Sequence, residues 1–218
     1  MAMAAHEYYQ QTGDTQLASS FWSLLKLATY SQCADKSVST TGLVDFDRCP
    51  RDSKLWPTTR DNIDWPMNSR DGYVNSNQST EVNAFAVFSS RKLAALGRAI
   101  GKTAEAERLE SQANTTADAM RKLLIDPSTG LFHDGLQGGA EKHSAWHSQT
   151  STLWLGIAPL ESKARMLEFL AQKRMVGSVY AAYSYLMGLY EVDSDHGKVA
   201  LEMMTDCDEN SWCHMLSV

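Results

Sequence analysis

The sequence has no block of basic residues and no long apolar run, and no signal peptide is visible in it. Its 218 residues carry a net charge of −6 with acids and bases interspersed, so nothing predicts a nucleic acid as partner. No apolar run approaches the length of a membrane-spanning helix, so no membrane partner is predicted. The segment Met1–Glu7 has no charged stretch followed by an apolar one, and the localisation therefore stays open. With 43% hydrophobic and 21% charged residues, the chain has an ordinary globular composition.

Paired cysteine motifs are also missing. None of the four cysteines, Cys33, Cys49, Cys207 and Cys213, belongs to a Cys-x-x-Cys pair. The spacing of Cys207 and Cys213 does not match a zinc pattern, and we expect isolated, mostly buried thiols. A disulfide between Cys33 and Cys49 stays open, because it would require secretion and the sequence does not define the compartment.

One Pro/Gly-punctuated loop, Ile63–Tyr73, concentrates the residue types that bind sugars, and a helix beginning near Thr80 follows it. The candidate binding residues in these two segments are Asp64, Trp65, Arg70, Asp71, Tyr73 and Glu81. An indole stacks on the C–H face of a sugar ring, while carboxylates and a guanidinium hydrogen-bond its hydroxyls. The alternative is a polar surface loop anchored by a buried Trp65, with Glu81 favouring the helix dipole.

Apolar residues recur at helical spacing along most of the remaining chain and predict about eight helices. The segment Asp35–Asn62 shows no period and is expected to be irregular. Antiparallel helix hairpins are the economical arrangement for such a chain. The long polar loops, 35–79, 131–147, 174–178 and 206–211, fall on every second connection. We therefore expect them at one rim, which would bring together Trp65, Asp71, Tyr73, His143, His147, Gln149 and Trp212.

Two further patterns have a structural and a functional interpretation. His143 and His147 are expected on one helix face at i,i+4, a spacing that can bind metal. Because no third ligand is nearby, we predict no metal and no cofactor, and a pocket-lining role is preferred. The tyrosines at 180, 183 and 190 are at helical spacing and are expected in the core.

Several short motifs resemble the bacterial α-L-rhamnosidases of glycoside hydrolase family 78. They occur in the family's order over nearly the whole chain: Tyr8-Tyr9-Gln10-Gln11-Thr12-Gly13-Asp14, Asp64-Trp65 before Thr80-x-x-Asn83-Ala84, Ser148-Gln149-Thr150 before a Leu-rich helix, Ser178-Val179-Tyr180-Ala181, and Ser211-Trp212-Cys213-His214-Met215-Leu216. The resemblance implies an all-α fold, a partial (α/α)₆ toroid of antiparallel helix hairpins, with residues 1–218 forming an incomplete six-hairpin barrel domain.

The resemblance also implies an activity, the inverting hydrolysis of terminal α-L-rhamnose from glycosides. Inversion uses one carboxyl group as general acid and another as general base. The substrate-binding set would then comprise Asp64, Trp65, Arg70, Asp71, Tyr73, Glu81, His143, His147 and Trp212. The family's acid motif precedes the Tyr8-Tyr9 helix and its base follows the Trp212 segment. We therefore expect a piece of a catalytic domain that binds substrate and is itself inactive.

Two alternatives remain beside this hypothesis. One is another helical-toroid carbohydrate hydrolase, which would place its acids elsewhere. The other is a non-catalytic helical scaffold, which predicts a regular repeat, and no fixed period is visible. An incomplete toroid would expose apolar helix faces, so a homodimer through an open barrel edge is a further expectation.

Overall fold

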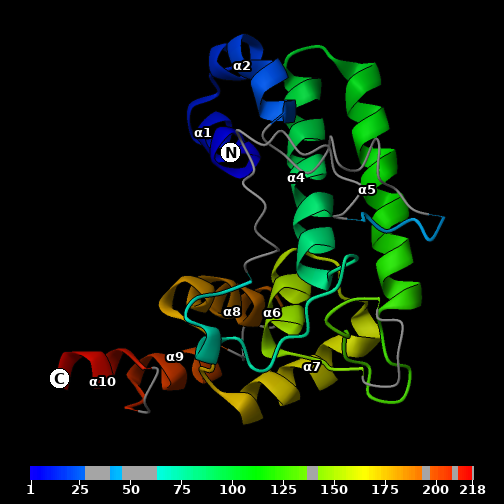
Figure 1. Cartoon of the computed structure of the whole chain (residues 1–218). Coiled ribbons are helices and arrows are strands. Elements are labelled where there is room, and N and C mark those ends of the chain that lie inside the picture. The colour runs from blue at the N-terminus through cyan, green and yellow to red at the C-terminus, as the bar shows by residue number, and fades with distance from the viewer. Residues whose placement is uncertain (28–39, 46–62, 137–141, 193–196, 208–210, 218) are drawn as a thin grey trace. The chain divides into compact units, whose positions relative to one another are not determined.

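A computed structural model describes residues 1–27, 40–45, 63–136, 142–192, 197–207 and 211–217 (Figure 1). Within these ranges the chain forms nine α-helices and no β-strand, as the sequence predicts. An antiparallel bridge joins Ile125 to Phe132. No helix in the described ranges has both the length and the apolar character to cross a bilayer. Of the segment 35–62 that is expected to be irregular, only residues 40–45 are described. Cys33 and Cys49 lie outside the described residues, so their predicted state is not tested.

The chain divides into two compact units, residues 1–58 with 77–122 and residues 59–76 with 123–218. Unit 1 contains α1 (Ala2–Thr12), α2 (Gln16–Leu27), α4 (Thr80–Ala99) and α5 (Thr103–Leu123). Its core is made by small and aliphatic residues around one indole: Ala2, Ala5, Ala18, Trp22, Leu25, Leu93, Ala94, Leu96, Ala106 and Leu109. The α4–α5 hairpin is visible in Figure 1 as two long green helices.

Helix ends in unit 1 follow the sequence signals. Ser79 is the N-cap of α4, and its side chain accepts a hydrogen bond from the backbone nitrogen of Val82. Gly13 ends α1 in the left-handed conformation, with φ of 69°. In the core, Nε1 of Trp22 donates to Glu105, which also pairs with Lys26 at 2.6 Å, so the indole nitrogen is satisfied.

Unit 2 contains a 3₁₀ turn (Met67–Ser69), α6 (Trp146–Trp154), α7 (Leu160–Lys173), α8 (Val179–Val192), α9 (Gly197–Thr205) and α10 (Trp212–Ser217). Helix α6 packs on both α7 and α8, and α9 continues the array from α8 to α10. Trp146 and Tyr185 meet between α6 and α8 with ring centroids 5.0 Å apart, and both are fully buried. Burial raises the pKa of Tyr185 to about 12, although nearby Arg174 lowers it, so the phenol is neutral.

The face of α8 that enters the core is not the one expected. Tyr180, Tyr183 and Tyr190 are 87%, 53% and 52% exposed, so the prediction that they pack in the core is wrong. The buried stripe is Ala182, Tyr185 and Leu189, which share a face at i,i+3 and i,i+7. Both sets of residues have helical spacing. Packing against α6 determines which of the two faces of α8 is buried.

The expectation of isolated thiols is also wrong for two of the cysteines. Cys207 and Cys213 form a disulfide between the end of α9 and the beginning of α10. Their Cα atoms lie 4.7 Å apart, within the range that a disulfide requires. Spacing along the sequence does not reveal this approach.

Gly177 lies against the buried indole of Trp146, and this contact yields a testable prediction. A Cβ atom at Gly177 would lie 2.6 Å from Cζ3 of Trp146. The ring is fully buried, so it can move aside only by displacing packed neighbours. We therefore expect Gly177→Ala to lower the free energy of unfolding by about 1–3 kcal/mol through overpacking, measured by urea denaturation.

A double-mutant cycle supplies the control. Trp146→Leu removes the ring atoms that the new methyl group would meet, so the Gly177→Ala penalty should shrink in that background. An equal penalty in both backgrounds would show that the ring contact is not the cause.

Candidate functional site

Four connections of unit 2 are linked by side-chain contacts, as the hairpin argument predicts. The segments 63–76, 131–145 and 174–178 are joined by hydrogen bonds. Asp71 forms an ion pair with Lys173 at the end of α7, and Arg174 forms one with Asp206 before α10. These contacts show that the loops of unit 2 touch one another, while the common rim that would also include Trp212 stays a prediction. Three acidic residues, Asp64, Asp71 and Asp134, supply most of the acceptor atoms.

Asp64 is the first of these acceptors and is buried, with 6% of its surface exposed. Its Oδ2 accepts hydrogen bonds from Nε2 of His147 at 2.9 Å and from the backbone nitrogen of Ser178 at 2.8 Å. Its Oδ1 accepts from the Ser178 hydroxyl and from the backbone nitrogen of Trp65. The carboxylate thus joins the Trp65 loop to α6 and to the beginning of α8.

The charge of Asp64 is stabilised by these donors. Burial raises the pKa of Asp64, but the hydrogen bonds from His147, Ser178 and Trp65 outweigh it and lower the pKa to about 2. Asp64 is therefore an ionised acceptor near neutral pH, and Nε2 of His147 carries the hydrogen. Among the described residues, Nδ1 of His147 is buried without a hydrogen-bond partner.

Asp71 reaches its contacts from a left-handed backbone conformation. Its φ is 50°, and Gly72 follows with φ of 69°, so the chain reverses sharply at this point. One carboxylate oxygen accepts from the backbone nitrogen of Trp146 at 2.8 Å, at the N-terminus of α6. The other pairs with Lys173 at 2.7 Å, at the end of α7.

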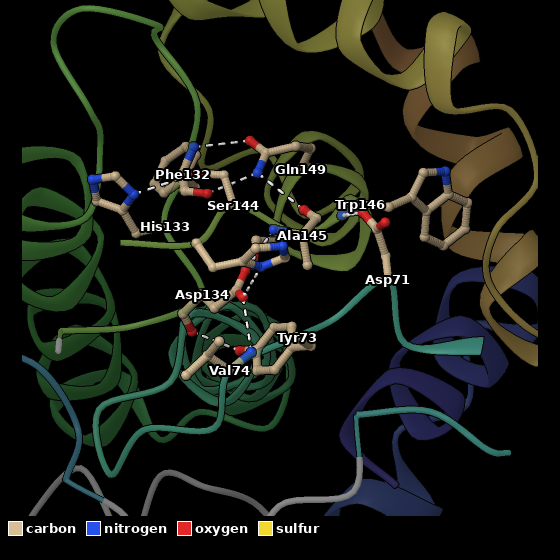
Figure 2. A network of polar contacts seen from close by, with 12 residues as sticks. Asp71, Tyr73, Val74, Phe132, His133, Asp134, Ser144, Ala145, Trp146 and Gln149 are labelled. Carbon is tan, nitrogen blue, oxygen red and sulfur yellow. Dashed lines mark hydrogen bonds and ion pairs between the residues drawn. The ribbon is translucent and has the colours of Figure 1, made fainter. Parts of the chain in front are cut away.

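Asp134 is fully buried and organises a second cluster, which Figure 2 shows from close by. Its Oδ2 contacts Nδ1 of His143 at 2.6 Å and accepts from the backbone nitrogen of Val74 at 2.9 Å. Its Oδ1 accepts from the backbone nitrogen of Ala145 and the hydroxyl of Ser148, both in the first turn of α6 or just before it. Its backbone oxygen accepts from the Tyr73 hydroxyl at 2.6 Å.

Gln149 secures the same connection from inside α6. Its Oε1 accepts from the backbone nitrogen of Phe132, and its Nε2 donates to the Phe132 oxygen at 2.7 Å and to Ala145 (Figure 2). The side chain thereby pairs with an extended backbone segment as a neighbouring strand would. This buried amide is satisfied, so its role in the structure is to position the 131–136 loop.

The two histidines do not share a helix face, which corrects the sequence prediction. Helix α6 begins at Trp146, so His143 lies before it and His147 within its first turn. His143 binds Asp134 and His147 binds Asp64, in two separate clusters. In the described part of the chain, no group of three or more His, Cys, Asp or Glu side chains is arranged to hold a metal ion.

Trp65 is 67% exposed, which contradicts the alternative that it anchors the loop in the core. Arg70 is half-buried, and its Nε donates to the backbone oxygen of Asp64 at 2.6 Å. Glu81 lies in the first turn of α4 in unit 1, where it favours the helix dipole. Trp212 is half-buried as the first residue of α10, between the two cysteines of the disulfide.

Three residues of the cluster were missed from the sequence: Asp134, Lys173 and Ser178. Asp134 stands in a His-Asp-Gly turn after a short extended segment, which was a usable signal for a loop acid. Ser178 precedes α8 and accepts from the Tyr180 backbone nitrogen, as an N-cap serine does. Nothing in the sequence distinguishes Lys173 from other lysines in a last helical turn.

Paired helices with acidic and aromatic residues gathered on their connecting loops define an all-α protein of the helix-hairpin class. The sequence model of the bacterial α-L-rhamnosidase six-hairpin glycosidase domain matches residues 1–218. The chain therefore belongs to this family, whose fold is an α/α toroid. No curated protein matches the chain in sequence.

Two solved structures share the fold. A family 78 rhamnosidase of Bacillus sp. GL1 aligns with a TM-score of 0.75 at 20% identity, covering 99% of this chain and 21% of that one. A rhamnosidase from Klebsiella oxytoca with rhamnose bound aligns with a TM-score of 0.68 at 17% identity, covering 99% and 37%. The chain thus spans about a fifth and somewhat over a third of their lengths.

Replacement of Asp64 by asparagine tests the buried acceptor. The amide keeps one acceptor oxygen and turns an NH₂ group toward donors, so we expect a loss of about 2 kcal/mol in the free energy of unfolding near neutral pH. The pKa of Asp64 is depressed in the folded state, so this stabilisation is present above its ordinary value of 3.8 and is lost as the pH falls toward about 2.

Urea denaturation of the native and Asp64→Asn proteins at several pH values provides the measurement. The difference in free energy of unfolding between the two proteins should decrease as the pH falls below about 4. Asp118→Asn is the control, because that side chain is 76% exposed. A pH-independent gap would contradict the assignment of Asp64 as an ionised, hydrogen-bonded acceptor.

Proposed function

We propose that this chain is the substrate-binding part of a glycosidase that removes terminal α-L-rhamnose from glycosides. Residues 1–218 would supply helices and loops to a larger six-hairpin domain. The proposal is supported by membership of the rhamnosidase family and by one observation above all. An indole that is 67% exposed stands next to a buried, hydrogen-bonded carboxylate on converging loops.

Trp65 is the proposed stacking platform for the rhamnose ring. Its neighbour Asp64 is held by His147 and Ser178, so the backbone at Trp65 is attached to two helices. A platform fixed in this way loses little conformational entropy when a sugar binds. Asp64 and His147 thus contribute by holding the platform.

Polar partners for sugar hydroxyls are proposed around the same loop. Arg70, Asp71 and His143 are partly exposed, and each is oriented by a contact with the backbone or with a charged neighbour. Tyr73 is buried and acts by fixing the loop. Trp212, which lies in the same unit, is proposed as a further member of the substrate-binding set.

Hydrolysis with inversion requires a general acid and a general base about 6.5–9.5 Å apart, with a water between them. The three aspartates of this cluster are committed as acceptors to several donors each, and the pKa of Asp64 is lowered, whereas a general acid needs a raised one. We therefore assign the acid and the base to residues outside this cluster.

Truncation of the platform tests the binding proposal. Trp65→Ala should weaken L-rhamnose binding to the chain roughly tenfold, because an aromatic platform contributes on the order of 1.5 kcal/mol. Binding is measured by NMR titration. Met67→Ala is a matched control, since Met67 lies in the same loop and is also 67% exposed. Equal effects of the two substitutions would reject the platform role.

The assignment of acid and base outside the cluster has its own test. The 218-residue chain should bind rhamnose but release p-nitrophenol from p-nitrophenyl α-L-rhamnoside no faster than a heat-denatured sample. Turnover that disappears in Asp71→Asn would place a catalytic carboxylate in the cluster and contradict the assignment.

A further inference from the structure

Tyr180 is the most exposed aromatic side chain among the described residues, at 87%, and Trp65 is next at 67%. Both lie in unit 2. Single exposed rings are common on protein surfaces, so the exposure of Tyr180 by itself carries no argument. What singles it out is its position beside the Asp64–Ser178 contact, which also holds the exposed Trp65.

A chain of three hydrogen bonds connects the two aromatic residues. The backbone nitrogen of Trp65 donates to Oδ1 of Asp64, which accepts from the Ser178 hydroxyl. The same hydroxyl oxygen accepts from the backbone nitrogen of Tyr180 at 3.2 Å. Since a hydrogen bond spans about 3 Å, the two backbone nitrogens lie within roughly 9 Å of each other. The two backbones are therefore close enough for both side chains to reach one ligand made of two linked rings.

Tyr180 is held as firmly as Trp65. It lies in the first turn of α8. Ser178 stabilises this turn with two hydrogen bonds: its hydroxyl accepts from the backbone nitrogen of Tyr180, and its backbone oxygen accepts from that of Ala182. On the opposite face of the helix, Ala182 and Tyr185 are buried. The ring of Tyr180 is therefore presented outward by a helix whose other side is in the core.

We propose that Tyr180 is the platform for the group attached to the rhamnose, that is, the neighbouring sugar or aromatic aglycone. The inference rests on the proposed function, with Trp65 taking the rhamnose itself. Two exposed aromatic faces linked through one buried carboxylate form adjacent subsites. A flat ring selects for a ring-shaped leaving group rather than for a small alcohol, so Tyr180 determines specificity on the leaving-group side.

Binding of two probes separates this inference from the proposed function. The ligands are methyl α-L-rhamnoside and a disaccharide in which an α-L-rhamnosyl group is linked to glucose, titrated into the full chain by NMR. Tyr180→Ala should weaken disaccharide binding about fivefold and leave the methyl rhamnoside unchanged. Tyr180→Phe, which keeps the ring, should bind both as the native chain does. Trp65→Ala should weaken both.

Tyr190→Ala is the matched control, because Tyr190 is 52% exposed near the other end of α8. If Tyr180→Ala leaves disaccharide affinity unchanged, or weakens both ligands equally, a separate subsite at Tyr180 is rejected while rhamnose binding stands. If the native chain binds neither probe, the proposed function and the inference both fall. Loss of a concentration-dependent dimer in Tyr180→Ala, with unchanged disaccharide affinity, would instead assign this surface to a second copy of the chain.

Discussion

Two buried carboxylates hold the loops of unit 2 together. A charge removed from water is tolerated when hydrogen bonds replace its hydration, and Asp64 and Asp134 each accept such bonds at both oxygens. Most of the donors come from segments far apart in sequence from the carboxylate that they bind. Because these carboxylates must be hydrogen-bonded, they fix the positions of the loops 63–76, 131–145 and 174–178 and of the N-termini of α6 and α8.

This constraint separates positioning residues from exposed ones. Residues that touch the carboxylates, such as His147 and Ser148, are buried, and each makes a hydrogen bond that orients a carboxylate. Immediately beside them, Trp65 and Tyr180 are exposed. An aromatic ring on a backbone that is fixed in this way is preorganised for a ligand, since little freedom remains to be lost on binding.

Some residues of the candidate site can be predicted from the sequence and others cannot. The Ile63–Tyr73 loop was recognisable from its residue types, and the hairpin argument correctly placed it near 131–145 and 174–178. The pairing of His143 with Asp134, and of His147 with Asp64, was not predictable. Two histidines four residues apart are compatible with a single helix face, and only the position of the α6 N-terminus at Trp146 separates them.

The sequence by itself determined the all-helical class and the family, because helical periodicity and ordered motifs are local properties of the chain. The tertiary structure decided which helix face is buried, as α8 shows by burying Tyr185 and exposing Tyr180. It also decided that Cys207 meets Cys213 and which donors reach Asp64 and Asp134. These outcomes depend on packing between segments distant in sequence, where several local patterns are equally acceptable and only one arrangement fills the core and satisfies every buried charge.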